Sequence, residues 1–266
     1  MTGLDEEPLA GGLESGRVVR IGETVRRPPG PWTATIHALL THLQGKRFPA
    51  PLPIGFDEVG RETLSFIDGR AGNWPWPPAL LELRGVRQIA ELLTDYHGAV
   101  ADFTPPSPVV WRQGACDPAP GEIVLHGDFG PYNLIWRDEE LVGVIDWDLS
   151  HPGRPIEDAA FAASQCVPLR ENIAPLGFAS PPDRRARLEA FAEAYGAFTA
   201  AELIAGLFEV SAANIGRMER LGAQEIEPWN GWVRRGLLSR THDEMAWLRG
   251  WTATEGLLPE VQAAEM

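Results

Sequence analysis

Three side chains that could act on a phosphate group follow one another in a short stretch of the chain. Asp128 and Asn133 lie in the segment His126–Asn133 (HGDFGPYN), and Asp146 lies eighteen residues beyond Asp128 in the segment Val144–Asp148 (VIDWD). Phosphoryl transfer from a nucleotide needs a carboxylate at the acceptor hydroxyl, and an amide and a second carboxylate that hold Mg²⁺ against the phosphates. The order and spacing therefore predict Asp128 as the catalytic base, with Asn133 and Asp146 as metal ligands.

The amino-acid sequence of this stretch also resembles that of a known family. His-Gly-Asp, four residues, Asn, and then Ile-Asp-Trp-Asp is similar to the aminoglycoside phosphotransferase family, which includes choline kinase-like relatives. The segment Pro131-Tyr132-Asn133 and the strand Ile-Asp-Trp-Asp look closest to its trifolitoxin-immunity-like branch. The resemblance implies a protein-kinase-like fold, Mg²⁺ and ATP or GTP as cofactors, and a small molecule whose hydroxyl accepts the phosphate.

Two further groups of residues are candidates for substrate contacts. Asp148 lies two residues beyond Asp146, so on an extended chain both side chains face the same side. It is expected to assist the metal or a substrate amine, or to form a structural hydrogen bond. Trp229 and Trp232 lie three apart in a late helical segment, where the family often builds its acceptor pocket, and plain helix packing is the alternative. His126 is expected to hold the loop rather than to catalyse.

The residues expected to bind the nucleotide depart from the usual pattern. Kinase-like folds carry a Lys on the third strand that pairs with a Glu on the following helix. Here the strand reads Thr24-Val-Arg-Arg27 and the helix has His37 at the Glu position. Arg26 or Arg27 is therefore expected to replace the Lys, with Arg26 preferred, and the usual ion pair is expected to be absent.

Two more segments are candidates for nucleotide contacts. Residues 11–16 (GGLESG) are Gly-rich without the full phosphate-loop spacing, which is a weak signal. Ser65, Phe66 and Ile67 resemble the strand and hinge that receive the base, where backbone groups would make the hydrogen bonds.

Composition and charge exclude several classes of protein. The 266 residues are 44% hydrophobic and 23% charged, as in ordinary globular proteins, and carry a net charge of −14. Nucleic-acid binding is not expected, because it requires clustered Lys and Arg. No apolar stretch reaches the roughly 20 residues of a membrane helix. The two cysteines give no disulfide framework, and a cytoplasmic location is expected; the oligomeric state is left open.

The elements around the motif predict an α+β fold of two lobes. Alternating strands on both sides of Gly22, a helix over residues 33–43 and two strands over residues 49–67 indicate a small β-rich lobe, residues 1–67. Residues 68–78 are a Gly- and Pro-rich hinge. A larger, mainly helical lobe, residues 79–266, is expected to contain helices at 79–103, 157–165, 183–206, 207–221 and 229–251.

Two alternatives to an active phosphotransferase remain. The missing Lys–Glu pair favours a catalytically impaired kinase-like protein that binds a nucleotide or another ligand in a protective or regulatory role. A scaffold protein whose acidic loop is residual is the other alternative, and an exposed tryptophan patch would favour it.

Overall fold

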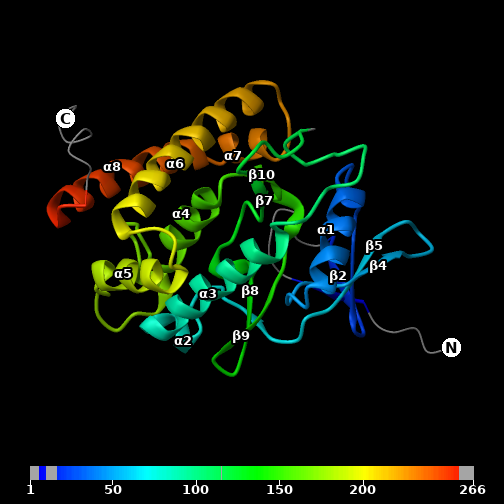
Figure 1. The fold of residues 1–266 in the computed structure, drawn as a ribbon, viewed down its shortest axis with the longest axis horizontal. Helices are drawn as coiled ribbons and strands as arrows, with labels where there is room; N and C mark the ends of the chain where they lie inside the picture. Colours follow the sequence, from blue (N-terminus) through cyan, green and yellow to red (C-terminus); the bar gives the residue numbers. More distant parts are fainter. Residues whose placement is uncertain (1–5, 10–16, 115, 258–266) are drawn as a thin grey trace. The chain divides into compact units, whose positions relative to one another are not determined.

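The computed structural model describes residues 6–9, 17–114 and 116–257 (Figure 1). The chain forms two compact units, and each consists of two stretches of sequence. The first unit is formed by Met1–Asn73 and Leu92–Pro155, and the second by Trp74–Glu91 and Ile156–Met266. In these units the segment 126–148 groups with the N-terminal strands, and the predicted lobe bounds stay a prediction.

A five-stranded antiparallel sheet forms one part of the first unit. Its strand order is β1-β2-β3-β5-β4. The hairpin between β2 and β3 turns at Gly22, whose φ of +58° favours glycine. The prolines at 28 and 29 follow β3 directly, and they end it because proline has no N–H for the sheet. The strands are β1 (Glu7–Pro8), β2 (Val19–Ile21), β3 (Thr24–Arg27), β4 (Pro53–Phe56) and β5 (Glu62–Ser65).

Helix α1 (Thr33–Gly45) follows this first hairpin and confirms the helix predicted from residue 33. Its apolar residues recur at helical spacing, so they form one stripe. Ile36, Leu39 and Leu43 in this stripe are fully buried. The helix contacts β4 and the short 3₁₀ helix η2 (Trp147–Leu149).

The motif itself lies between two small antiparallel sheets of the same unit. One pairs β7 (Ile123–Leu125) with β10 (His151–Gly153), and the other has the order β6-β8-β9. The backbone N–H of Val144 bonds the carbonyl of Pro49 (2.9 Å) and so ties the end of β9 to the first third of the chain. The remaining elements are β6 (Arg70–Ala71), η1 (Pro131–Asn133), β8 (Leu134–Arg137) and β9 (Glu140–Val144).

The helix predicted over residues 79–103 is two helices in the structure. α2 (Pro78–Leu81) ends at Glu82, whose backbone is extended, and α3 (Leu83–Val100) begins directly afterwards. Val86, Ile89 and Leu93 of α3 are fully buried. At its far end the hydroxyl of Tyr96 donates to the carbonyl of Val124 (2.8 Å), which anchors β7.

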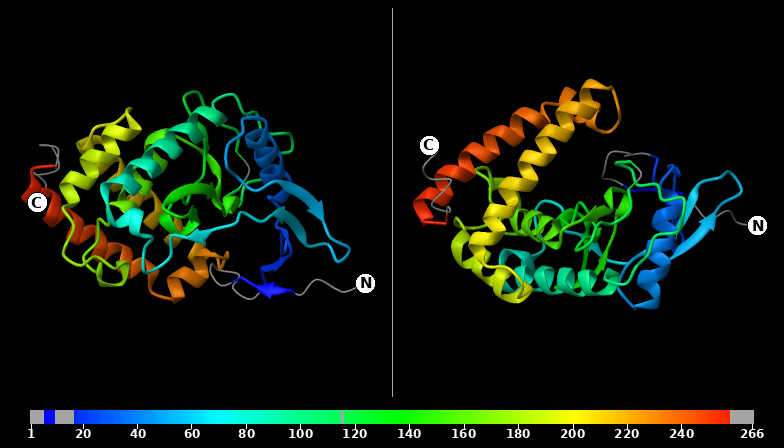
Figure 2. Two further views of the ribbon diagram at one scale, coloured as in Figure 1. Left: turned by 90° about the horizontal axis from the view of Figure 1, so that it is seen from below. Right: turned by 45° about the horizontal axis from the view of Figure 1, so that its top comes forward.

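The second unit is mainly helical, but two predicted boundaries are wrong. The helix expected over residues 183–206 ends at Gly196 (φ +83°), and Thr199 then begins the next helix with a capping box to Glu202. The helix expected over residues 229–251 breaks at Gly236 (φ +75°). Figure 2 shows α6 and α8 running alongside each other. The helices are α4 (Pro155–Cys166), η3 (Ala174–Leu176), α5 (Arg184–Tyr195), α6 (Ala200–Ala223), α7 (Trp229–Arg234) and α8 (Leu237–Glu255).

The length and hydropathy of the helices bear on whether any of them could span a membrane. Within the described residues, no single helix is both long and apolar enough to cross a bilayer. α5 and α6 meet the length and composition criteria only as a pair, and the two are bent by 95°.

Candidate functional site

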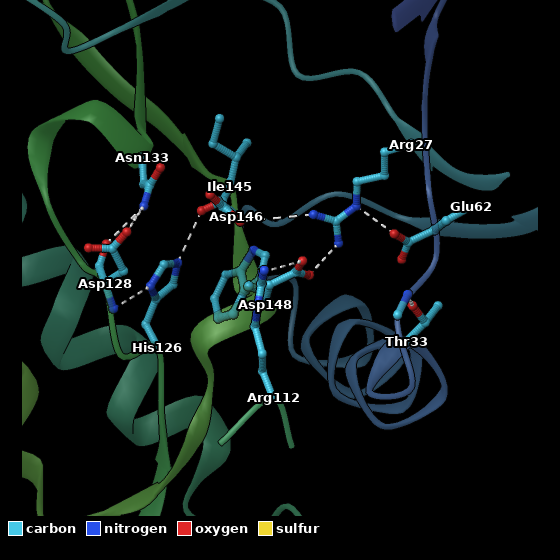
Figure 3. A network of polar contacts seen from close by, with 12 residues as sticks. Arg27, Thr33, Glu62, Arg112, His126, Asp128, Asn133, Ile145, Asp146 and Asp148 are labelled. Atoms are coloured by element: carbon cyan, nitrogen blue, oxygen red, sulfur yellow. Dashed lines mark hydrogen bonds and ion pairs between the residues drawn. The ribbon is translucent and has the colours of Figure 1, made fainter. Parts of the chain in front are cut away.

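The loop after β7 brings Asp128 into position through a glycine that no other residue could replace. Gly127 has a φ of +79°, and a Cβ atom there would lie 2.3 Å from the carbonyl oxygen of Leu149. Any side chain would therefore push the loop away from the segment before β10. The loop then turns through η1, which places Asn133 back beside Asp128 (Figure 3).

Both carboxylate oxygens of Asp128 accept hydrogen bonds from residues of the same loop. The side-chain amide of Asn133 donates to Oδ2 (3.0 Å) and also to the backbone carbonyl of Asp128 (3.0 Å). The hydroxyl of Tyr132 donates to Oδ1 (2.5 Å). The carboxylate is therefore held in one orientation, as a base must be if it is to meet an acceptor hydroxyl.

Asn133 connects this loop to Asp146. Because its amide nitrogen faces Asp128, its amide oxygen lies on the other side, as Figure 3 shows. The backbone N–H of Ile145 donates to the backbone carbonyl of Asn133 (2.9 Å), which brings Asp146 next to the loop. Asp146 has a left-handed backbone (φ +63°) and a half-exposed side chain. Such a backbone is uncommon for a residue other than glycine and clusters at functional sites.

His126 also joins the loop that contains Asp128 to the segment that contains Asp146. The N–H of Asp128 donates to Nδ1 (3.2 Å), so the ring proton sits on Nε2, which donates to the carbonyl of Ile145 (3.1 Å). The ring is fully buried, with its centroid 4.6 Å from that of Trp147. This geometry agrees with the structural role expected for His126.

Arg27 reaches the acidic segment from β3. Its Nε donates to Glu62, its Nη2 to Oδ1 of Asp148 (2.7 Å), and its Nη1 lies 3.9 Å from Oδ1 of Asp146. Figure 3 shows the guanidinium between these carboxylates. A cation is thus placed beside the proposed metal ligand, where phosphate oxygens would approach.

The sequence preference for Arg26 does not match this geometry. Arg26 pairs with Asp57 in the turn between β4 and β5 (3.7 Å), away from Asp146. Neighbouring residues of a strand point to opposite faces, so only one of the two arginines can face the site. The register that places Arg27 opposite Glu62 selects Arg27.

The ion pair expected to be missing has a substitute. Glu62 of β5 takes the place of a helix Glu, and it accepts from Arg27 on one oxygen while its other oxygen lies 2.8 Å from Nε2 of His37. Burial favours the neutral acid, but the His37 hydrogen bond and the Arg27 charge outweigh burial and lower the pKa of Glu62. Burial likewise opposes the charge of Arg27, yet Asp148 and Glu62 raise its pKa.

Asp148 lies between two arginines. One oxygen accepts from Arg27, and the other lies 3.4 Å from Nη1 of Arg112, whose guanidinium stacks 4.5 Å from the ring of Trp32. In this arrangement Asp148 positions Arg27. Its predicted contact with a substrate stays a prediction.

The expected base-binding segment takes part in the main sheet. The N–H of Ser65 donates to Leu52, and the N–H of Phe66 donates to the carbonyl of Glu23 (2.9 Å). The ring of Phe66 carries the guanidinium of Arg20 at 3.8 Å. Ile67 lies against Gly143, where a Cβ would come within 2.9 Å of its methyl groups. Nucleotide contacts by Ser65, Phe66 and Ile67 remain a prediction, and the Gly-rich stretch 11–16 lies outside the described residues.

The two candidate tryptophans belong to α7 in the second unit. Their ring centroids lie 6.0 Å apart at an angle of 75°. Trp229 is buried and Trp232 is half-buried, as helix packing requires. An acceptor-binding role for Trp229 and Trp232 stays a prediction.

Three contributors to the site were missed from the sequence. Tyr132 gave no signal beyond its position before Asn133. Glu62 could have been found as a charged residue in an apolar strand, directly opposite Arg27 once β3 and β5 are paired. Arg112 lies in a Pro-rich loop, where no local pattern relates it to Asp148.

The donor set fits a magnesium ion. Among the described residues, no cluster of three or more His, Cys, Asp or Glu could hold a metal by itself. Magnesium needs no such cluster, because it shares its coordination with phosphates and water and takes one or two carboxylates from the protein. The half-exposed carboxylate of Asp146 and the amide oxygen of Asn133 are hard oxygen ligands of this kind.

Comparison with solved structures identifies the fold. The chain superposes on a choline/ethanolamine kinase family protein from Mesorhizobium loti with a TM-score of 0.57 at 16% identity, over 92% of each chain. It superposes on the GDP complex of aminoglycoside 2'-phosphotransferase-IIIa with a TM-score of 0.56 at 14% identity, over 94% of this chain and 93% of that chain. The predicted α+β, protein-kinase-like fold is confirmed.

Sequence comparison relates part of the chain to a known family. Residues 109–202 match the model of the phosphotransferase enzyme family APH, which confirms the predicted resemblance for this segment. The chain is also 39% identical over 156 residues to the trifolitoxin immunity protein of Rhizobium leguminosarum bv. trifolii. The match covers 56% of this chain and 58% of that protein, so it spans less than two thirds of the relative's length.

Proposed function

We propose that this protein transfers the γ-phosphoryl group of ATP or GTP to a hydroxyl of a small molecule, with Mg²⁺. The observation that carries the proposal is the hydrogen bond between Asp128 and Asn133, together with the backbone bond from Ile145 to Asn133 that places Asp146 beside them. Arg27 lies next to Asp146. The match to the phosphotransferase family and the GDP complex of a protein with the same fold support it.

Each residue has a defined task in this reaction. Asp128 orients the acceptor hydroxyl and takes its proton, so its oxygens must face the acceptor. Asn133 and Asp146 would hold Mg²⁺, which neutralises charge on the phosphates. Arg27, kept in place by Glu62 and Asp148, is positioned to contact phosphate oxygens as a fixed cation.

The remaining features of the proposal follow from composition and chemistry. With a net charge of −14, the chain suits a small, neutral or cationic acceptor and not a nucleic acid. Nucleoside triphosphates are cytoplasmic metabolites, so the proposal places the protein in the cytoplasm.

The test is Mg²⁺-dependent turnover of ATP and GTP over a panel of amino alcohols, aminoglycosides and sugars. Asp128→Asn should lower turnover by about 10²–10⁴-fold, because it removes the general base. Asp117→Asn, at an exposed loop position, should leave turnover unchanged. Chelation of the metal with EDTA should abolish turnover. Full activity of Asp128→Asn would refute the assignment.

The name of the 39% identical relative motivates a second candidate function. In this alternative, the protein binds a nucleotide or another ligand without phosphoryl transfer and acts in protection or regulation. A thermal-shift titration with Mg·ATP and Mg·GTP separates the two. Stabilisation without turnover over the acceptor panel favours the binding protein, because any ligand that binds only the native state raises its stability.

A further inference from the structure

The hydroxyl of Tyr132 lies where an acceptor hydroxyl is needed. It donates a hydrogen bond of 2.5 Å to Oδ1 of Asp128, while Asn133 occupies Oδ2. A general base must lie within about 2.6–3.2 Å of the oxygen whose proton it removes. The phenol thus makes the contact that the proposed reaction requires of its acceptor.

The loop is built to hold the phenol in this place. A Cβ on Gly130 would lie 2.7 Å from two ring atoms of Tyr132 and 2.9 Å from its hydroxyl oxygen, so the ring lies directly on the glycine backbone. Gly130 has a φ of −111°, which any residue can adopt. Glycine therefore leaves space for the ring here, and its backbone conformation is not the reason for its presence.

The side chain of Tyr132 is partly exposed to solvent. It is 38% exposed, although its neighbours Pro131 and Asn133 are buried. A partly exposed ring whose polar end is directed at a carboxylate is able to move aside without disrupting the core.

We propose that Tyr132 is a specificity-determining residue of the phosphotransfer site. Its hydroxyl occupies the acceptor position on Asp128 and is exchanged for the hydroxyl of a proper acceptor. Water, which gains too little from binding to displace the phenol, is thereby kept from the phosphate. This inference rests on the proposed function.

The chemistry that Tyr132 suppresses is nucleotide hydrolysis. In hydrolysis the bond between the γ-phosphorus and the bridging oxygen breaks, and the nucleoside diphosphate leaves. A water oxygen forms the new bond to phosphorus, its proton passes to Asp128, and the product is inorganic phosphate. Transfer to an acceptor is the same step with an alcohol oxygen in place of water.

The experiment measures hydrolysis of Mg·ATP and Mg·GTP by the full-length protein without any added acceptor. Tyr132→Phe keeps the ring over Gly130 and removes only the hydroxyl, so hydrolysis should rise about 5-fold, as expected for the loss of one hydrogen bond that water must otherwise displace. Gly130→Ala, which forces the ring off the backbone, should raise hydrolysis in the same direction. Tyr195→Phe, in the second unit, is the matched control and should leave the rate unchanged.

The outcomes separate this inference from the function on which it rests. Hydrolysis that is unchanged or reduced in Tyr132→Phe, with wild-type thermal stabilisation by Mg·nucleotide, overturns the role of Tyr132 alone. Absence of both nucleotide binding and hydrolysis in the wild type and in the variants overturns the proposed function together with this inference.

Discussion

Arg27 ties together carboxylates that come from two distant parts of the chain. Glu62 belongs to the main sheet, whereas Asp146 and Asp148 follow β9. Glu62 is almost completely buried, and an ion pair so enclosed depends on keeping both of its partners. At the scale of the residue, the site is therefore a network centred on one arginine and one aspartate, Asp128.

The assignment of Arg27 can be tested against its neighbour. Arg27→Gln should weaken Mg·ATP or Mg·GTP binding roughly 10- to 150-fold, because a hydrogen bond to a charged group contributes about 1.5–3 kcal/mol. Arg26→Gln, which alters only the pairing with Asp57, should change the affinity less than twofold. Isothermal titration calorimetry measures both.

Circular dichroism of both variants controls for folding, since Arg27→Gln removes a partner of the buried Glu62. If Arg26→Gln lost more affinity than Arg27→Gln, the phosphate contact would belong to Arg26, as the sequence predicted.

A buried arginine links the ends of two helices in the second unit. Arg187 of α5 is 3% exposed and donates to the carbonyls of Leu80 (2.7 Å) and Cys166 (2.8 Å), at the ends of α2 and α4. It also reaches the carbonyl of Leu81 (3.2 Å). The last carbonyls of a helix have no partner within it, so a buried cation there serves two helices at once.

Removal of this cation should destabilise the protein. Arg187→Met retains much of the packing volume but leaves several buried carbonyls without a donor, at a cost of about 3–4 kcal/mol in the free energy of unfolding. Arg185→Met on the same helix removes an exposed pair with Glu189 and an exposed bond to the carbonyl of Glu255, which water can replace, and should cost less than about 1 kcal/mol. Urea unfolding monitored by circular dichroism measures both, and equal costs would contradict the account.

At the scale of the whole molecule, Cys166 reports on unfolding. Burial raises the pKa of this thiol to about 12. The unfolded thiol ionises near 8.5, so between these two pH values the native state binds more protons than the unfolded state. The free energy of unfolding should therefore fall as the pH rises through this window.

Thiol alkylation checks this prediction. In Cys116→Ser, which removes the exposed cysteine, Cys166 should react with iodoacetamide roughly 10³-fold more slowly in the native protein than in denaturing urea, because reaction requires opening of the core. The native rate should increase with pH more steeply than the rate in urea. Rapid native alkylation at neutral pH would show that Cys166 is not enclosed.

Features that depend on the spacing of nearby residues could be predicted from the sequence. Asp128, Asn133 and Asp146 lie within nineteen residues of one another, so a strand, a tight loop and a hairpin suffice to bring them together. The same residues carried the resemblance to the phosphotransferase family, and that resemblance implied the fold class. The predicted strands of the main sheet and most helices with regular apolar periodicity are present. The predicted helices were too long where the chain breaks at Glu82, Gly196 and Gly236.

The residues that surround this motif could not be predicted in the same way, because they come from distant segments of the chain. The register of β3 against β5 chose Arg27 over Arg26 and supplied Glu62, since a strand turned by one residue would present the other face. Arg112 meets Asp148 across 36 residues. Such contacts depend on how separate segments pack, and no local pattern of residues encodes that packing.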